Sequence, residues 1–448
     1  MAIATRRIGL EQEFFLVDDL GDLSHRADDF LAQCRAMASD WGCDAKYFVP
    51  EFVKSTVEIN TPPAYTVAEL AGSYLKHLDL ALRAAREIGV RLYPLASYPL
   101  PVEPVMRDRP NCHAQARTLG YDRAQHSGRC TGTHLHLEAP PGSIDARIGV
   151  SYDTTPGDRA ELLNLYNLAT ALDAAMIALS RSCPFYQGQL SQQSSHIVRY
   201  RGSQVFDWEG VFTRVQCAGG LRPYANSIET LVELQFSRHY DWLKAMDAAK
   251  VDRALFLETG GSLLESAWNP IRLNAIGTVE IRCVDSNYPA IVIALMSLVN
   301  SVSQYVRRNG LTVKSVIGQT RFEQQGLDLL VPDFDYLNGP LLYAAVTAGI
   351  KHPDVNDYLH SILEFARPVN REDTDYLATL HTILTTHRTT EADILQQFQV
   401  VPSELSRESG LSLVRQCCDR LEQEVLSLYQ KHLSEAANAV MQETVSYV

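Results

Sequence analysis

Four short stretches of the chain alternate polar and apolar residues with the two-residue period of a β-strand. In "TVEIRC" (278–283), Thr, Glu and Arg alternate with Val, Ile and Cys. The same pattern runs through "GLEQEFFLVD" (9–18), "STVEIN" (55–60) and "TGTHLHLEAP" (131–140). Successive side chains of a strand point to opposite faces. Each stretch is therefore predicted to place apolar residues on a core and ionisable residues on the other face.

Three longer segments carry apolar residues at helical spacing instead. The clearest is 66–89, in which Thr66 begins a capping box and Gly89 fits a C-terminal stop. A second helix is predicted over 158–181 and a third over 289–310. Strands and helices are mixed in this part of the chain.

The character of the sequence changes after residue 310. Strand signals become sparse, and segments such as "PDVNDYLHSILEFAR" and "GLSLVRQCCDRLEQEVLSLYQKHL" have the pattern of amphipathic helices. The sequence predicts a core over 1–310 and a helical C-terminal region over 311–448 packed on it. A chain of 448 residues that is 46% hydrophobic is long enough to bury a sizeable core.

The charge and the cysteine content of the chain disfavour several classes of protein. The net charge of -13, without a run of Lys and Arg, disfavours binding to a nucleic-acid backbone. Nine scattered cysteines without a CxxC motif indicate a reduced, cytoplasmic protein, and "MAIATRRIGLEQEFF" lacks the apolar core of a signal peptide. The longest apolar run, "AIVIALMSLV" (290–299), is about half a membrane span and favours a buried helix. We expect neither nucleic-acid nor membrane partners.

The polar faces of the four predicted strands carry an unusual set of side chains. Alone, each is typical of a solvated strand or an ordinary cross-strand pair. If the strands lie side by side, five carboxylates and two imidazoles converge with one arginine to offset them. Such like charges raise one another's pKa or require cations. The residues in question are Glu11, Glu13, Glu58, His134, His136, Glu138, Glu280 and Arg282.

Carboxylate oxygens favour Mg²⁺, and the histidines leave room for Mn²⁺. Mg²⁺, several carboxylates and one arginine are the parts that phosphoryl transfer from ATP requires. The sequence contains neither a P-loop motif nor the protein-kinase motifs, so a nucleotide would be held by neither device. Two other classes stay open. One is a metal-dependent hydrolase or oxygenase built on His134, His136 and a carboxylate. The other is a non-catalytic protein that binds nucleotide or a partner through its helical C-terminal region.

The motifs also resemble a known family. "GLEQEFFLVD", "VEINTPP", "TGTHLHLEAP" and "WNPIRLNAIGTVEIR" (268–282) are similar, in the same order, to four signatures of the bacterial glutamate–cysteine ligase-like carboxylate–amine ligases. That family belongs to the glutamine synthetase superfamily. The resemblance covers about residues 7–310. It implies an α+β, glutamine synthetase-like fold, in which a curved, mostly antiparallel sheet forms a funnel with helices outside it. It also implies two or three divalent ions between ATP and the substrate carboxylate.

The resemblance also implies roles for individual residues. It makes Arg282 the arginine that contacts the transferred phosphoryl group. Trp268 and Arg272 occupy a W-x-x-x-R position expected to line the substrate pocket, and His136 matches a second family histidine. The metal ligands that it implies are Glu11, Glu13, Glu58, His134 and Glu280, with Glu51 as a further ligand.

The segment "CPFYQGQLSQQSSHIVRYRG" (183–202) resembles the variable substrate loop of the family. Its candidates for binding an amino-acid carboxylate are Ser194, Ser195, Arg199 and Arg201. A polar surface loop is an equally good interpretation of this segment.

The activity implied by the resemblance is a two-step ligation. A substrate carboxylate takes the γ-phosphoryl group of ATP, and an amine then displaces phosphate to form an amide. Glutamate and cysteine are the leading substrate pair, giving γ-glutamylcysteine on the way to glutathione. The same chemistry on a different acid and amine is the alternative, because family membership does not fix the substrate. Relatives in the superfamily often self-associate, so a homo-oligomer is also an expectation.

Overall fold

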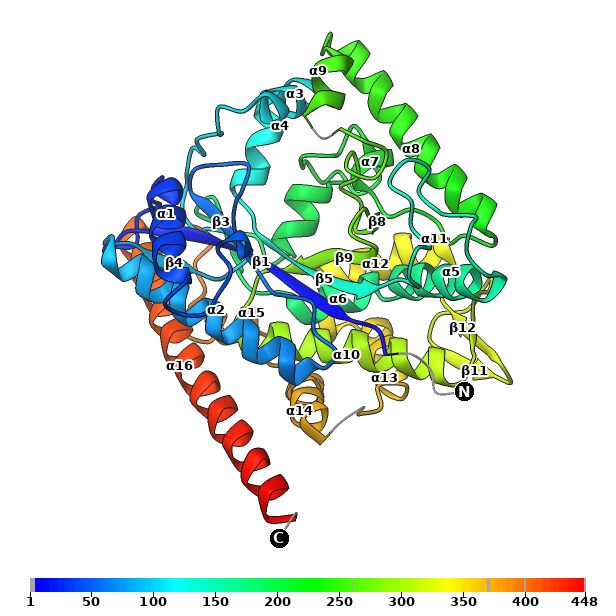
Figure 1. The fold of residues 1–448 in the computed structure, drawn as a ribbon. Helices are drawn as coiled ribbons and strands as arrows, with labels where there is room; N and C mark the ends of the chain where they lie inside the picture. Colours follow the sequence, from blue (N-terminus) through cyan, green and yellow to red (C-terminus); the bar gives the residue numbers. More distant parts are fainter. Residues whose placement is uncertain (1–4, 260, 369–370, 399, 447–448) are drawn as a thin grey trace.

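The four alternating segments form neighbouring strands of one sheet in the computed structural model, which describes residues 5–259, 261–368, 371–398 and 400–446 (Figure 1). The first four residues of the segment that lacks a signal-peptide pattern lie outside the described residues. The sheet runs in the order β2-β3-β1-β5-β9-β8, and β4 also pairs with β1. Its strands are β1 (Ile8–Val17), β2 (Phe48–Pro50), β3 (Thr56–Asn60), β4 (Arg91–Tyr93), β5 (Gly132–Glu138), β8 (Ile271–Asn274) and β9 (Thr278–Asp285).

Every strand pair in this sheet is antiparallel. Together with the helices around the sheet, this confirms the predicted α+β fold with a mostly antiparallel sheet. The alternation of side chains determines which face meets the core. Leu10, Val57, Leu135 and Ile281 are all buried in the main hydrophobic core. Gln12 shares that face and is fully buried, with its side-chain amide donating to the backbone oxygen of Asn287 at 2.7 Å.

Long helices cover the apolar face, below the sheet in Figure 1. The predicted helix over 66–89 is confirmed, with the Thr66 hydroxyl accepting from the backbone N–H of Glu69. The helix after Pro289 is long and apolar enough to cross a membrane, but most of it is buried in the protein core, as the sequence indicated. The helices on this side are α2 (Val67–Glu87), α10 (Pro289–Arg308), α14 (Arg371–Thr386) and α16 (Arg407–Ser446).

The helix predicted over 158–181 is divided in two. α5 (Pro156–Ala171) and α6 (Asp173–Ser180) meet at Leu172 with a bend of 42°. The first residue of α6, Asp173, is fully buried and pairs with Arg201 at 2.9 Å. Sequence periodicity missed this break because apolar residues continue through it without Gly or Pro.

A second layer lies over the polar face of the sheet, above it in Figure 1. It has a small hydrophobic cluster of its own that includes Phe212, Trp242, Met246 and Phe256. Tyr200 and Trp268 pack at the border of that cluster. The polar face is thus enclosed between two layers. The main helices of the upper layer are α3 (Pro110–Leu119), α7 (Gln216–Gly219), α8 (Ile228–Ala248) and α9 (Arg253–Glu258).

The C-terminal region was expected to be helical, but it is only partly so. It begins with a three-stranded sheet of β10 (Thr312–Ser315), β12 (Asp328–Val331) and β11 (Glu323–Gln325). These strands have three or four residues, too short for a clear alternation. Its later helices contribute to the same main core as the large sheet. The division at residue 310 stays a prediction.

The remaining elements are short or peripheral. The helices and helical turns are α1 (Ala27–Ala38), η1 (Ala45–Tyr47), α4 (Tyr121–Ala124), η2 (Gln125–Gly128), η3 (Ile197–Arg201), α11 (Phe334–Tyr336), η4 (Leu337–Leu341), α12 (Leu342–Thr347), η5 (Gly349–Lys351), α13 (Pro353–Leu363) and α15 (Thr390–Leu395). A small hairpin pairs β6 (Phe185–Tyr186) with β7 (Gln189–Leu190).

Candidate active site

The strand register gathers the predicted polar residues on one face. Because β3, β1, β5 and β9 are consecutive in the sheet, their polar side chains form a continuous row. Three cross-strand pairs are Glu13 with Glu58, Glu11 with His134, and His136 with Glu280. We call the seven residues formed by these three pairs and Glu51, which precedes β3, the carboxylate row.

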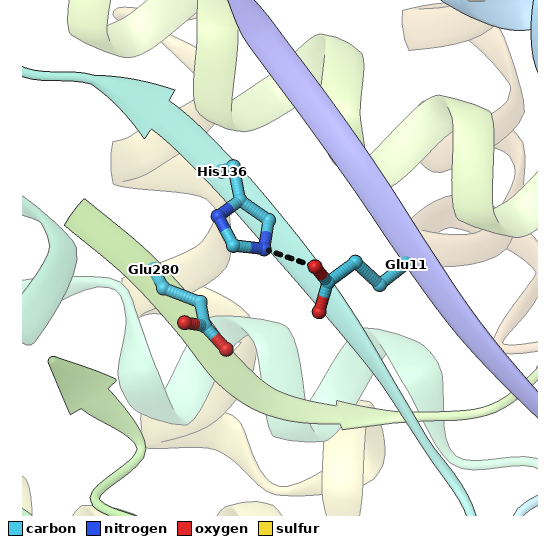
Figure 2. A group of neighbouring side chains, drawn as sticks. All are labelled: Glu11, His136 and Glu280. Carbon is cyan, nitrogen blue, oxygen red and sulfur yellow. Dashed lines mark ion pairs between the residues drawn. The ribbon is translucent and has the colours of Figure 1, made fainter. Parts of the chain in front are cut away.

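Oxygen and nitrogen atoms of the carboxylate row come close enough to share cations. Three groups among the described residues each offer ligand atoms within 4.8 Å of one another. Figure 2 shows one of them, in which side chains from β1, β5 and β9 point toward a common space. The groups are Glu11, His136 and Glu280; Glu11, Glu58 and His134; and Glu13, Glu51 and Glu58. His136, which the resemblance left without a metal role, therefore lies among the candidate ligands.

Glu280 is fully buried and surrounded by donors. Arg272 Nε lies 2.6 Å from Glu280 Oε2, and Arg282 Nη1 lies 2.5 Å from Glu280 Oε1. The Asn274 amide also donates to Glu280 Oε2 at 2.6 Å. Burial raises the pKa of Glu280, but the two guanidinium groups outweigh it and hold that pKa well below its usual range. The sequence had offered one arginine to offset the carboxylates, and the β8–β9 pairing adds Arg272 as a second.

At the opposite end of the row, no described arginine or lysine forms an ion pair with Glu13, Glu51 or Glu58, although the charge of Arg282 lowers the pKa of Glu13 and of Glu51. Burial and the neighbouring Glu51 raise the pKa of Glu13 to about 8, against the hydrogen bond that the Gly132 N–H donates at 2.8 Å. Burial and the charge of Glu11 raise the pKa of Glu58 well above its ordinary value. Burial also raises the pKa of Glu51. These three carboxylates are therefore poised to exchange protons for a cation.

The histidines of β5 complete a donor set for divalent ions. Burial and Arg282 lower the pKa of His134 to about 4, which keeps its imidazole neutral and able to ligate. Burial lowers the pKa of His136, but Glu11 and Glu280 outweigh burial and raise it overall. In the part of the chain that the structure describes, neither His134 Nε2 nor His136 Nε2 has a hydrogen-bond partner, although His136 Nε2 lies 3.3 Å from Glu11 Oε1. Buried nitrogens without partners beside carboxylates fit Mg²⁺ or Mn²⁺.

Two cavities adjoin the carboxylate row. One, of about 340 Å³, lies against Glu13, Glu58 and Arg282. Its other walls include Arg272 of β8 and residues outside the sheet, which are Phe52, Arg109, Asn111, Gln115, Tyr200 and Trp268. We call it the arginine-side cavity. The second, of about 520 Å³, lies against Glu11 and His136 and is lined by Ile8, Leu10, Tyr47, Pro63 and Ile276 among others.

The structure places the polar candidates of the 183–202 segment away from the arginine-side cavity. The Ser194 hydroxyl donates to Asp285 at 2.8 Å, and Ser195 donates to the hydroxyl of Ser97 at 3.0 Å. None of the four candidates lines the cavity. Both hydroxyls thus have hydrogen-bond partners within the protein, and a role for them in binding an amino-acid carboxylate stays a prediction.

The two arginines of that segment are engaged in the same way. Arg201 is buried and forms an ion pair with Asp173 at 2.9 Å, while the Arg199 guanidinium lies 4.3 Å from the ring centre of Tyr186. The segment instead contributes an aromatic residue that sequence reasoning missed: Tyr200 lines the cavity. His196 and Tyr200 stack with ring centres 4.9 Å apart. Their spacing of four residues was the available signal, but a π-helical turn has no clear sequence pattern.

The chain is also similar to proteins that are already known. Residues 7–201 match the profile of glutamate-cysteine ligase family 2. A protein named "Putative glutamate--cysteine ligase 2" from Pseudomonas aeruginosa (strain LESB58) is 26% identical over 210 residues, which are 46% of this chain and 48% of the relative. A protein of the same name from Gloeobacter violaceus is 25% identical over 308 residues, 67% of this chain and 68% of the relative. The chain thus spans about half the length of the Pseudomonas relative that it matches.

Two solved structures share the fold. Glutamate–cysteine ligase from Francisella tularensis, solved in complex with AMP, gives a TM-score of 0.58 at 10% identity and covers 99% of this chain and 94% of its own. A bifunctional glutathione synthetase from Pasteurella multocida gives a TM-score of 0.53 at 15% identity and covers 94% of this chain and 52% of its own. At such identities the likeness is one of fold.

Proposed function

We propose that this chain, whose residues 7–201 match the profile of glutamate-cysteine ligase family 2, is an ATP-dependent carboxylate–amine ligase. The observation that carries the proposal is the carboxylate row beside Arg282 on one face of the sheet. Two anions, a carboxylate and a triphosphate, repel each other in water. A site that brings them together needs fixed positive charge and ligands for cations.

Different residues of the site would bind the cations, contact the phosphoryl group and exclude water. The carboxylate row would hold Mg²⁺ or Mn²⁺, which neutralises phosphate oxygens and supports in-line attack when bound. Arg282, buried and paired on one side with Glu280, would present its remaining donors to the transferred phosphoryl group. The upper layer would keep bulk water away from the acyl phosphate. A funnel-shaped site with ATP and the amino-acid substrates on either side of the metals belongs to the same proposal.

The two-step ligation consumes only ATP, the acid and the amine. An oxygen of the substrate carboxylate attacks the γ-phosphorus, and ADP leaves. The nitrogen of a neutral amine then attacks the acyl carbon, phosphate leaves with that oxygen, and the amine gives up one proton. Glutamate as the acid and cysteine as the amine, giving γ-glutamylcysteine for glutathione synthesis, are the proposed substrates. The names of the relatives support this pair.

The hydrolase or oxygenase hypothesis receives less support. It requires His134 and His136 on one metal with an open position. Among the described residues, the two imidazoles fall into different ligand groups. That hypothesis also leaves Arg282 and Glu13 without a role.

The test is ADP release from Mg²⁺-ATP and glutamate, with free amino acids added one at a time and products identified by mass. Cysteine-dependent release that is lost in Glu280→Ala supports the proposal. Glu422→Gln, which alters another Glu–Arg pair far from the cavity, is the matched control and should behave like the wild type. Release with a different amine keeps the ligase and replaces the substrate. No release over a broad panel of acids and amines, from folded and metal-loaded protein, contradicts the proposal.

We also propose a reduced, cytoplasmic location. All nine cysteines are free thiols, which supports a reducing compartment. Self-association is proposed on the superfamily resemblance alone, and size-exclusion chromatography with light scattering tests it.

A further inference from the structure

Tyr200 stands between the two layers that enclose the site. It lines the arginine-side cavity together with Trp268 and Arg282. Tyr200 and Arg282 are close enough for their charges to act on each other, and the charges of Glu13 and Glu51 also act on Tyr200. A phenol beside the arginine and the carboxylates of the site is not a neutral part of the cavity wall.

The Tyr200 ring is held by aromatic neighbours on two sides. His196 stacks on it at 4.9 Å with an interplanar angle of 13°, and Phe212 meets it edge-on at 5.3 Å. Phe212 in turn stacks on Trp268 at 5.3 Å. Such offset and edge-on contacts fix ring positions within a packed cluster. Tyr200 and Trp268 are therefore two walls of one rigid aromatic unit.

The backbone that carries Tyr200 is fastened at both ends. On the N-terminal side, the buried Asp285 carboxylate accepts from Ser194 Oγ at 2.8 Å and from the His196 N–H at 3.0 Å. On the C-terminal side, Arg201 pairs with Asp173 at 2.9 Å. The polar residues of this segment thus hold its backbone in place, and Tyr200 faces the cavity. Ligand sites built on such fixed supports are specific because little rearranges on binding.

The two cavities differ in the charge and polarity of their walls, so they fit different ligands. The arginine-side cavity carries both signs of charge, with the carboxylates of Glu51 and Glu58 inside it and Arg109 at its mouth. Arg109 is exposed, and no described residue forms an ion pair with it. An amino acid, which has an ammonium and a carboxylate group, matches that charge pattern. The cavity beside His136 has more apolar walls and fits a nucleoside.

We propose that Tyr200 is a positioning and specificity-determining residue for the amino-acid substrate. Its hydroxyl holds Arg282 toward the reacting phosphoryl group, and its ring forms with Trp268 the wall against which the amino acid packs. This inference rests on the proposed ligase function. It assigns the amino-acid substrates to the arginine-side cavity.

The experiment compares wild type, Tyr200→Phe and Tyr200→Leu in steady-state ADP release, varying ATP, the acid and the amine in turn. Tyr200→Phe keeps the ring and removes the hydroxyl, so we expect kcat to fall about 10-fold with each KM within about twofold of the wild type. Tyr200→Leu removes the wall, so we expect a higher KM for the amino acids, an unchanged KM for ATP and a wider range of accepted amines. Tyr305→Phe, which removes a hydrogen-bonded hydroxyl on the remote α10, is the control.

The outcomes separate this inference from the function on which it rests. If Tyr200→Phe and Tyr200→Leu keep the kcat, KM values and amine range of an active wild type, the inference is wrong and the ligase stands. A change in the KM for ATP alone would move Tyr200 to the nucleotide and also overturn it. A wild type without turnover on the full panel overturns both. If Tyr200→Leu does not fold, the split between kcat and KM in Tyr200→Phe decides.

Discussion

Glu13 of β1 lies directly opposite Glu58 of β3, so two buried carboxylates face each other across neighbouring strands. Like charges directly opposite each other destabilise a sheet. Burial, Glu11 and Glu51 raise the pKa of Glu58, and the charge of Glu13 raises it further. This pair gives the clearest physical sign that the site is built for cations.

We therefore expect Glu58→Gln to stabilise the metal-free protein at pH 8 by up to about 1 kcal/mol, because a neutral amide is buried beside Glu13 without first taking up a proton. The same change should weaken binding of Mn²⁺, because it removes one charged ligand. Urea unfolding without divalent ions and calorimetric titration with Mn²⁺ measure the two effects. Equal loss of stability with and without metal would contradict the assignment, and Glu422→Gln is the matched surface control.

The raised pKa of Glu13 predicts a dependence of stability on pH. Its carboxyl is protonated in the folded protein up to a pKa of about 8, against an ordinary value of 4.5. The folded state therefore binds more protons than the unfolded state between these values, and stability falls as the pH rises through that window. The melting temperature of metal-free protein should fall from pH 5 to pH 8, and Glu13→Gln should flatten the curve. A flat curve for the wild type would contradict the raised pKa.

Cation binding should release protons for the same reason. At pH 7 a divalent ion replaces the protons on Glu13 and Glu58, because their raised pKa values keep them protonated in its absence. Calorimetric titration with Mg²⁺ in two buffers of different ionisation enthalpy measures the number of protons released. We expect more than zero at pH 7 and fewer at pH 9. The absence of any buffer dependence would count against these carboxylates as ligands.

Arg272 makes a prediction about the other end of the row. It holds the fully buried Glu280 through two contacts of 2.6 and 3.1 Å. Arg272→Met should destabilise metal-free protein by about 1–3 kcal/mol, because the buried Glu280 carboxylate loses two of its hydrogen bonds. Added Mn²⁺ should restore more stability to the variant than to the wild type, since it supplies the missing positive charge. The stability of Arg272→Lys should lie between that of the wild type and that of Arg272→Met. If Mn²⁺ restores equal stability to the wild type and to Arg272→Met, Glu280 is not a metal ligand.

Asp285 makes a prediction about the aromatic unit. Its carboxylate accepts from Ser194 and from the His196 backbone, which fastens the segment that ends in Tyr200. Asp285→Ala should speed hydrogen exchange at the amides of 194–201, because both bonds are lost. Asp285→Asn keeps an acceptor oxygen and should change exchange less. Unchanged exchange in both variants would show that packing alone holds the segment.

The sequence by itself determined the faces of the strands. A two-residue period separates the two sides of a strand whatever its neighbours are, so Glu11 and Glu13 had to share a side, as did His134 and His136. The capped helix after Thr66 and the buried helix after Pro289 were equally local, because their signals lie within one segment. The order of the motifs along the chain then indicated the resemblance to the carboxylate–amine ligases.

The tertiary structure decided what depends on register and on neighbours. Arg272 joins Glu280 only because β8 pairs with β9 in one particular register, and no local pattern contains that information. The bend at Leu172 and the pairing of Arg201 with Asp173 likewise follow from packing that the local sequence pattern does not specify. Ser195, Arg199 and Arg201 looked like ligand-binding groups in the sequence because they are polar, but buried partners already satisfy or cover them. Tyr200 faces the cavity because long-range contacts orient the segment, and composition alone could not reveal that orientation.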